Sequence, residues 1–183
     1  MRFIFLTAVT LVIVGCSTSQ PTVAPIVTEA PKTTESAPLE PLPQVTPHPD
    51  VITIAEAIAL LNDPSAVAST AKHHGYKMLS NYGVYRLDNY SSMLYKNCKP
   101  AKLMGNNVYE DMPLPLRKGT SSYVAIKDDV TIGVFNAKAY TNLTEQLLAA
   151  GFRLVSEGHE TEYTNGTHTA YCYASRKTIR IEK

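Results

Sequence analysis

Histidines and carboxylates gather in one short part of this sequence. His159, Glu160, Glu162 and His168 fall on and around a segment expected to form a hairpin. Imidazole nitrogens and carboxylate oxygens bind zinc, and the same groups can act as general acids and bases. Their spacing matches no established metal-site pattern, so a hydrolytic or metal-dependent centre in His159–His168 is the alternative hypothesis and no metal site is predicted.

Other arrangements that could carry chemistry are few. His73 and His74 are adjacent near an expected helix end, where we interpret them as side chains that suit the partial negative charge and not as a metal pair. There is no Ser-His-Asp arrangement, glycine-rich phosphate loop or CxxC motif. Lys and Arg number 17 against 16 acidic residues, so nucleic-acid binding is not expected. We therefore predict no catalytic residue and no cofactor.

Cys98 and Cys172 form a candidate disulfide in the C-terminal part of the chain. Paired cysteines outside the cytoplasm are often bridged. Two buried free thiols, which are common in protein cores, are the other interpretation, and the sequence leaves both open.

Tyrosines are the third chemical feature, and all eleven lie from Tyr76 onward. Tyrosine suits half-buried sheet faces and also protein interfaces, because it combines apolar area with a polar tip. Either packing in the sheet or a binding face is therefore expected, and the candidate binding residues are Tyr85, Tyr95, Tyr163, Tyr171 and Tyr173.

The N-terminal residues have the pattern of a secretory signal peptide. Arg2 precedes an apolar run, Phe3–Val14, that would rise about 18 Å as a helix and is too short for a hydrocarbon core of about 30 Å. The run ends in Ile13, Val14, Gly15 and Cys16, which resembles the lipobox of bacterial lipoproteins.

That resemblance has several implications. It implies that residues 1–15 are removed and that Cys16 carries a diacylglyceryl group and an acylated amino terminus. More than one acyl chain is needed because a single chain binds membranes only marginally. Ser17 stands where an aspartate would imply retention in the inner membrane, so the periplasmic side of the outer membrane is favoured.

Residues 16–50 are predicted to form a tether that follows the lipidated cysteine. Eight of the twelve prolines lie between Pro21 and Pro49, and the segment has no aromatic residue. Such a composition favours an extended, polyproline-like spacer without a core. The remaining residues, 51–183, are of a common size for a single domain.

Two helices, each ended by a glycine, are expected in this domain, after a short helix over 55–62. Asp63 and Pro64 predict the start of the first, which would end at His74 before Gly75. The second is predicted to begin near Thr141 or Asn142 and to end before Gly151.

Strands are expected after each helix. They are predicted over Tyr76–Leu87, Tyr90–Asn97, Tyr123–Ile126, Val130–Phe135, Phe152–Tyr163, Thr167–Ala174 and Thr178–Glu182, with a two-residue turn at Asn165 and Gly166. Gly75–Ser80 resembles Gly151–Ser156, which suggests a tandem helix–strand–strand repeat over about 55–98 and 139–183. The predicted fold class is α+β, with helices packed on an antiparallel sheet.

The main functional hypothesis is a lipid-anchored cell-envelope protein whose domain binds or assembles without catalysis. Its expected partners are the membrane, through the anchor, and an unidentified protein or cell-wall component. The alternative is an envelope hydrolase or metal-dependent enzyme that uses the His159–His168 region.

Overall fold

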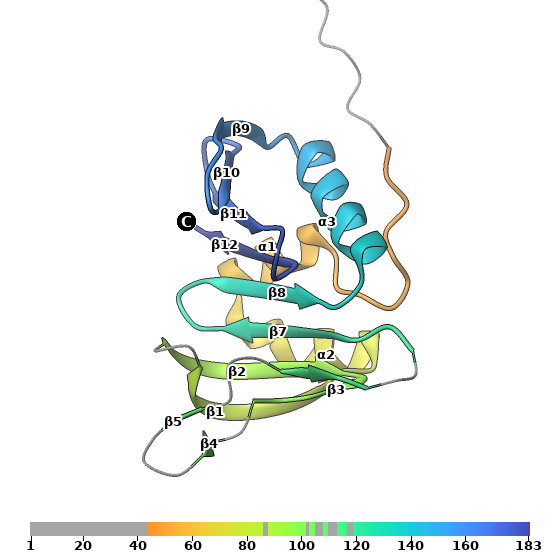
Figure 1. Ribbon diagram of the computed structural model, residues 1–183, viewed down its shortest axis with the longest axis vertical. Helices are drawn as coiled ribbons and strands as arrows, with labels where there is room; N and C mark the ends of the chain where they lie inside the picture. The colour runs from red at the N-terminus through yellow and green to blue at the C-terminus, as the bar shows by residue number, and fades with distance from the viewer. Residues whose placement is uncertain (1–43, 86–87, 102, 105–107, 110–112, 117–118) are drawn as a thin grey trace, which may run out of the picture. The chain divides into compact units, whose positions relative to one another are not determined.

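The structure, a computed structural model, describes residues 44–183 apart from 86–87, 102, 105–107, 110–112 and 117–118 (Figure 1). It describes only the backbone of 81–85, 88–89, 103–104 and 108–109. Cys16, the expected signal peptide and most of the expected tether lie outside the described residues. In the described part, no helix is both long enough and apolar enough to cross a membrane.

Three α-helices and twelve strands make up the described part of the chain. The helices are α1 (Ile54–Asn62), α2 (Val67–His74) and α3 (Ala137–Ala149), and a short 3-10 turn covers Pro64–Ala66. The strands are β1 (Lys77–Tyr85), β2 (Asp88–Lys96), β3 (Cys98–Lys99), β4 (Leu103–Met104), β5 (Val108–Tyr109), β6 (Leu114–Pro115), β7 (Ser122–Ile126), β8 (Val130–Val134), β9 (Arg153–Ser156), β10 (Thr161–Thr164), β11 (Thr169–Tyr173) and β12 (Thr178–Glu182).

Eight strands form one antiparallel sheet in the order β1-β2-β7-β8-β12-β11-β10-β9. In chain order, β1, β2, β7 and β8 are placed side by side from one edge of the sheet to its centre. The strands β9 to β12 are placed in the same way from the other edge, and β8 pairs with β12 at the centre. Two small sheets, β3-β6 and β4-β5, lie in the connection between β2 and β7. The predicted α+β class, with helices on an antiparallel sheet, is confirmed.

The helices cover one face of this sheet. α1 contacts β8, β12 and α3, and α2 contacts β1, so the main core lies between helices and strands (Figure 1). Alternate residues of β7, β8, β11 and β12 enter it, as Val124 and Ile126 of β7 and Ile179 and Ile181 of β12 do. Burying these side chains on one face is the usual stabilising arrangement of a half-covered sheet.

A second core lies on the opposite face but covers only the β2–β7 side. Met93, Tyr123 and Ala125 are buried there against Cys98 and Ala101 of the connection that follows β2. The ring of Tyr123 also fills the space above its cross-strand partner Gly133, where an added Cβ would collide with the ring. We call this surface the outer face and the helix side the inner face.

Side-chain caps and a glycine fix the ends of the helices. Thr53 and Glu56 form a reciprocal capping box at α1. The Asp63 side chain caps the turn that leads into α2, and Gly75 ends α2 with a φ of 69°. The predicted start of α3 at Thr141 or Asn142 was wrong, because Asn136 accepts a hydrogen bond from the Ala139 amide and begins the helix at Ala137.

Two strand predictions in the C-terminal half need correction. The single strand predicted over Phe152–Tyr163 is two strands, because the chain reverses after Ser156 and pairs Glu162 with it. The turn at Asn165 and Gly166 belongs to a four-residue connection, since Thr164 pairs with Thr169. The Asn165 side chain accepts hydrogen bonds from two backbone amides of this connection, which stabilises the longer turn.

The two halves of the sheet share one topology. Each has a helix ended by a glycine with positive φ, then a meander of four strands from edge to centre. The sequence match does not follow this correspondence. Aligning Gly75 with Gly151 places β2 on residues 164–172, which are the end of β10, the connection after it and most of β11, the third strand of the second meander. A duplication therefore remains a prediction, and its sequence support is limited to the helix ends and first strands.

The folded part begins before residue 51, the predicted domain boundary. Asn142 of α3 accepts a hydrogen bond from the His48 amide and donates one to the Thr46 carbonyl, each at 2.9 Å. Asp50 pairs with Lys96 of β2 at 3.0 Å. The last residues of the expected tether are thus attached to the domain.

Candidate functional site

The outer face of β10–β12 is the main candidate for a binding surface. Ala170 and Cys172 of β11 point into the inner core, so Tyr171 and Tyr173 point to the outer face. Both tyrosines are half-exposed. The connection that follows β2 packs on the other end of this face, over Met93, Tyr123 and Ala125.

Arg180 organises the centre of this surface. Its guanidinium lies over the Tyr171 ring, 4.5 Å from the ring centroid. It also lies 3.5 Å from a Glu160 oxygen and 3.8 Å from a Glu182 oxygen. Exposed ion pairs of this kind stabilise a fold little, but a planar guanidinium held over an aromatic ring is a common element of protein interfaces.

The Tyr171 hydroxyl of this surface remains protonated at neutral pH. Desolvation and the neighbouring Glu182 carboxylate raise the pKa of Tyr171 above its ordinary value. The Tyr173 ring contacts the His159 ring, with centroids 4.6 Å apart. The surface therefore offers two aromatic rings with hydrogen-bonding groups at their edges.

A shallow pocket adjoins this surface at the turn between β7 and β8. Its volume is about 400 Å³, and it is lined by Lys127, Asp128, Asp129, Arg180, Glu182 and Lys183. Cations and carboxylates are equal in number there. Such a balanced lining does not suit a polyanion and does suit a partner of mixed charge.

The five tyrosines predicted as one binding face do not share a face. Tyr163 packs against the inner core, where Tyr140 and Cys172 are its neighbours. Tyr95 is half-buried in the outer cluster beneath the connection that follows β2. The side chain of Tyr85 lies outside the described residues. Only Tyr171 and Tyr173 are therefore placed on the outer face of β10–β12.

Of the two interpretations of Cys98 and Cys172, the structure has the second, since both thiols are free and buried and the candidate disulfide is not formed. Cys98 belongs to the outer cluster and Cys172 to the inner core, so the sheet separates them. Cys98 lies in β3, which pairs with β6 and not within the large sheet that contains Cys172.

The His159–His168 region does not assemble as a reactive centre in the structure. His159 contacts Tyr173, Glu160 pairs with Arg180, and His168 is buried with its Nδ1 atom without a hydrogen-bond partner among the described residues. A different group brings potential metal-ligand atoms close together within the described part of the chain. It is formed by Glu56, His73 and His74.

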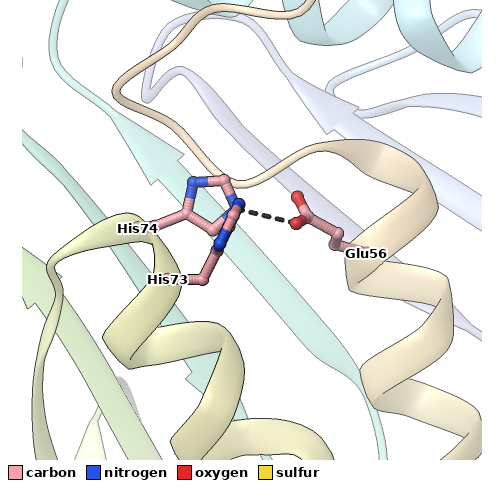
Figure 2. Close-up of side chains that lie close together, drawn as sticks. All are labelled: Glu56, His73 and His74. Atoms are coloured by element: carbon pink, nitrogen blue, oxygen red, sulfur yellow. Dashed lines mark hydrogen bonds and ion pairs between the residues drawn. The ribbon is translucent and has the colours of Figure 1, made fainter.

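Glu56, His73 and His74 come together where α1 and α2 approach each other (Figure 2). One potential ligand atom from each lies within 4.8 Å of the other two. His74 Nε2 is 2.8 Å from Glu56 Oε1. Partial burial acts to raise the pKa of the Glu56 carboxyl, but hydrogen bonds from His74 and Thr53 hold that pKa below its ordinary value.

This group was missed from the sequence. Neighbouring residues of a helix were expected to point apart, and Glu56 lies on another helix. The available signal was the Thr53–Glu56 capping box, which fixes a carboxylate at the start of α1.

Comparison with known proteins gives no relative. No protein-family description, curated protein or solved structure matches this chain.

Proposed function

We propose that this chain is a lipid-anchored cell-envelope protein whose folded domain binds another protein and catalyses no reaction. The proposed anchor is Cys16, on the lipobox resemblance of Ile13–Cys16. The proposed contact surface is the outer face of β10–β12, with Tyr171, Tyr173 and Arg180 at its centre.

The unequal covering of the outer face carries this proposal. At the β2–β7 end, the second core buries the outer side chains, whereas Tyr171, Tyr173 and Arg180 are half-exposed. Tyrosine and arginine are the residue types enriched in protein interfaces. The mixed charge of the adjoining pocket favours a protein partner over a nucleic acid.

Site-specific photo-crosslinking in cells tests the surface. A benzoylphenylalanine at position 173 is expected to form an adduct with one discrete protein, because it lies in the proposed interface. The same group at exposed Lys138 of α3 serves as the control and is expected to give none. Adding Arg180→Glu to the position-173 variant should abolish the adduct. Equal adducts at both positions would contradict the proposal.

The purified partner then gives the quantitative test. Tyr171→Ser or Tyr173→Ser is expected to lower its affinity by about tenfold or more, the loss typical of central aromatic interface residues. The denaturation midpoint should stay unchanged, since neither side chain belongs to a core cluster. Loss of binding that merely parallels loss of folding would remove the argument for an interface.

The anchor is tested separately. Cys16→Ser is expected to move the protein from the membrane fraction to the soluble fraction, because no acyl chains can be attached. Ser17→Ala, which keeps the thiol, is the matched control and should remain with membranes. Membrane association of the Cys16→Ser variant would overturn the lipoprotein assignment.

A further inference from the structure

The fold holds a carboxylate and two imidazoles at one point between two helices (Figure 2). His73 and His74 occupy the last turn of α2, just before Gly75. Glu56 lies in the first turn of α1. The three side chains thus come from segments that the chain positions by independent local signals, the capping box of α1 and the glycine end of α2.

The Glu56 carboxylate is fixed in orientation by its own helix start. Its Oε2 atom accepts hydrogen bonds from the Thr53 amide at 2.9 Å and from the Thr53 hydroxyl at 2.8 Å. This leaves Oε1 directed at His74. A ligand that is held by a partner outside the site is typical of metal centres, where such contacts orient the coordinating atoms.

The two imidazoles complete the donor set. The side chain of His74 is 10% exposed, and its ring lies edge-on to that of His73 with centroids 4.9 Å apart. His73 is exposed, so its ring can turn without disturbing the core. Among the described residues, three potential ligand side chains with close donor atoms occur at this place alone.

We propose that Glu56, His73 and His74 bind a divalent transition-metal ion of the zinc type. Two imidazole nitrogens and one carboxylate oxygen suit zinc, copper or nickel better than magnesium or calcium, which prefer oxygen ligands alone. Three protein ligands leave one tetrahedral position for water. The bound ion would join α1 to α2 through coordination bonds to all three side chains, where now a single hydrogen bond connects Glu56 to His74.

The distances require a small adjustment on binding. Metal–ligand bonds of about 2.0–2.2 Å place tetrahedral ligand atoms about 3.3 Å apart. The Glu56–His74 contact of 2.8 Å would therefore open slightly as the ion replaces the shared hydrogen. The His73 nitrogen now lies within 4.8 Å of the ligand atoms of Glu56 and His74, and it would have to come closer to them. An exposed side chain can do so by rotation.

Zinc titration of the untagged full chain in detergent tests this site. Isothermal titration calorimetry with zinc chloride is expected to give one binding event per chain, and zinc should raise the thermal midpoint where magnesium does not. His73→Ala is the decisive variant, because it removes one ligand and leaves the Glu56–His74 hydrogen bond intact. It should lower the zinc affinity by at least about tenfold, the loss that even an outer-shell partner can cause.

Two comparisons make the test decisive. His159→Ala removes an exposed histidine elsewhere and should bind zinc as the unchanged chain does. The zinc-free midpoint of His73→Ala should equal that of the unchanged chain, which separates ligand loss from misfolding. The proposal is overturned if the unchanged chain binds no zinc, or if His73→Ala binds it as tightly as His159→Ala does.

Discussion

Cys98 and Cys172 are buried on opposite sides of the sheet, and burial determines their chemistry. It raises the pKa of Cys98 to about 11 and the pKa of Cys172 to about 12. The thiolate is the reactive form of cysteine, so both groups are inert in the folded domain at neutral pH. Their position fits packing in two cores.

Thiol counting tests this arrangement. In a Cys16→Ser variant without reductant, we expect no reaction with a thiol reagent at pH 8 until the chain is unfolded, and then two reactive thiols. The result would follow from burial and from the absence of a bridge. Fewer than two thiols after unfolding would indicate a disulfide, and fast reaction before unfolding would contradict their burial.

The same groups predict how stability changes at alkaline pH. Their folded pKa values lie above the unfolded value near 9, so between these limits the folded chain binds more protons than the unfolded chain. The free energy of unfolding should therefore fall as pH rises from about 9 towards 11 and 12. Urea midpoints measured across this range check the sign, and Cys172→Ala should reduce the slope.

Individual residues were only partly predictable from the sequence. Tyr171 and Tyr173 share one face and Cys172 lies on the other, as the period-two alternation of a strand requires. That alternation could not show that Tyr163 points inward, since that depends on the register in which β10 pairs with β11, where Tyr163 lies opposite the buried Ala170. The pairing of Glu56 with His73 and His74 depends on how two helices pack, which no local pattern encodes.

At the scale of elements, helix ends were the most predictable features. Gly75 and Gly151 were identified as helix ends, and both have positive φ beyond a helix. The start of α3 was misplaced because two asparagines compete for the role. Asn136 is the cap, and Asn142 instead holds the segment before residue 51. A capping pattern cannot distinguish these roles, because the second depends on residues far away in the chain.

The cap of α3 gives a direct prediction. Asn136→Ala should lower the free energy of unfolding by about 1 kcal/mol, because the Ala139 amide loses its acceptor at the helix start. Asn136→Asp or Asn136→Ser keeps an acceptor and should restore most of that loss. Chemical denaturation of the three variants measures the difference, and equal stability of the alanine and aspartate variants would show that the cap contributes nothing.

At the scale of the whole folded part, the two meanders meet along β8 and β12 and share one helix-covered face. The sequence predicts this class because helices and alternating strands imply a two-layer core. Strand order was not predictable, since it depends on pairings between distant segments. The extent of the fold was not predictable either. The proline-rich composition before residue 51 indicates a spacer, and it gives no sign of the contacts that residues 46–50 make with the domain.

Those contacts predict that a chain beginning at residue 51 is less stable than one beginning at residue 44. The shorter chain loses the hydrogen bonds of Thr46 and His48 to Asn142 and the ion pair of Asp50 with Lys96. Each neutral hydrogen bond contributes about 1 kcal/mol and an exposed ion pair less, so a total loss of about 1–3 kcal/mol is expected.

Urea denaturation of both chains measures this loss, and Asn142→Ala sharpens the test. Because Asn142 is the partner of both hydrogen bonds, its substitution should be more damaging in the longer chain than in the shorter one. In the shorter chain only its bond to Gln146 remains to be lost. Equal midpoints for the two chains would mean that residues 44–50 are a spacer after all. Additive effects would mean that Asn142 acts on α3 alone. The expected non-additivity would instead show that residues 46–50 are part of the folded domain.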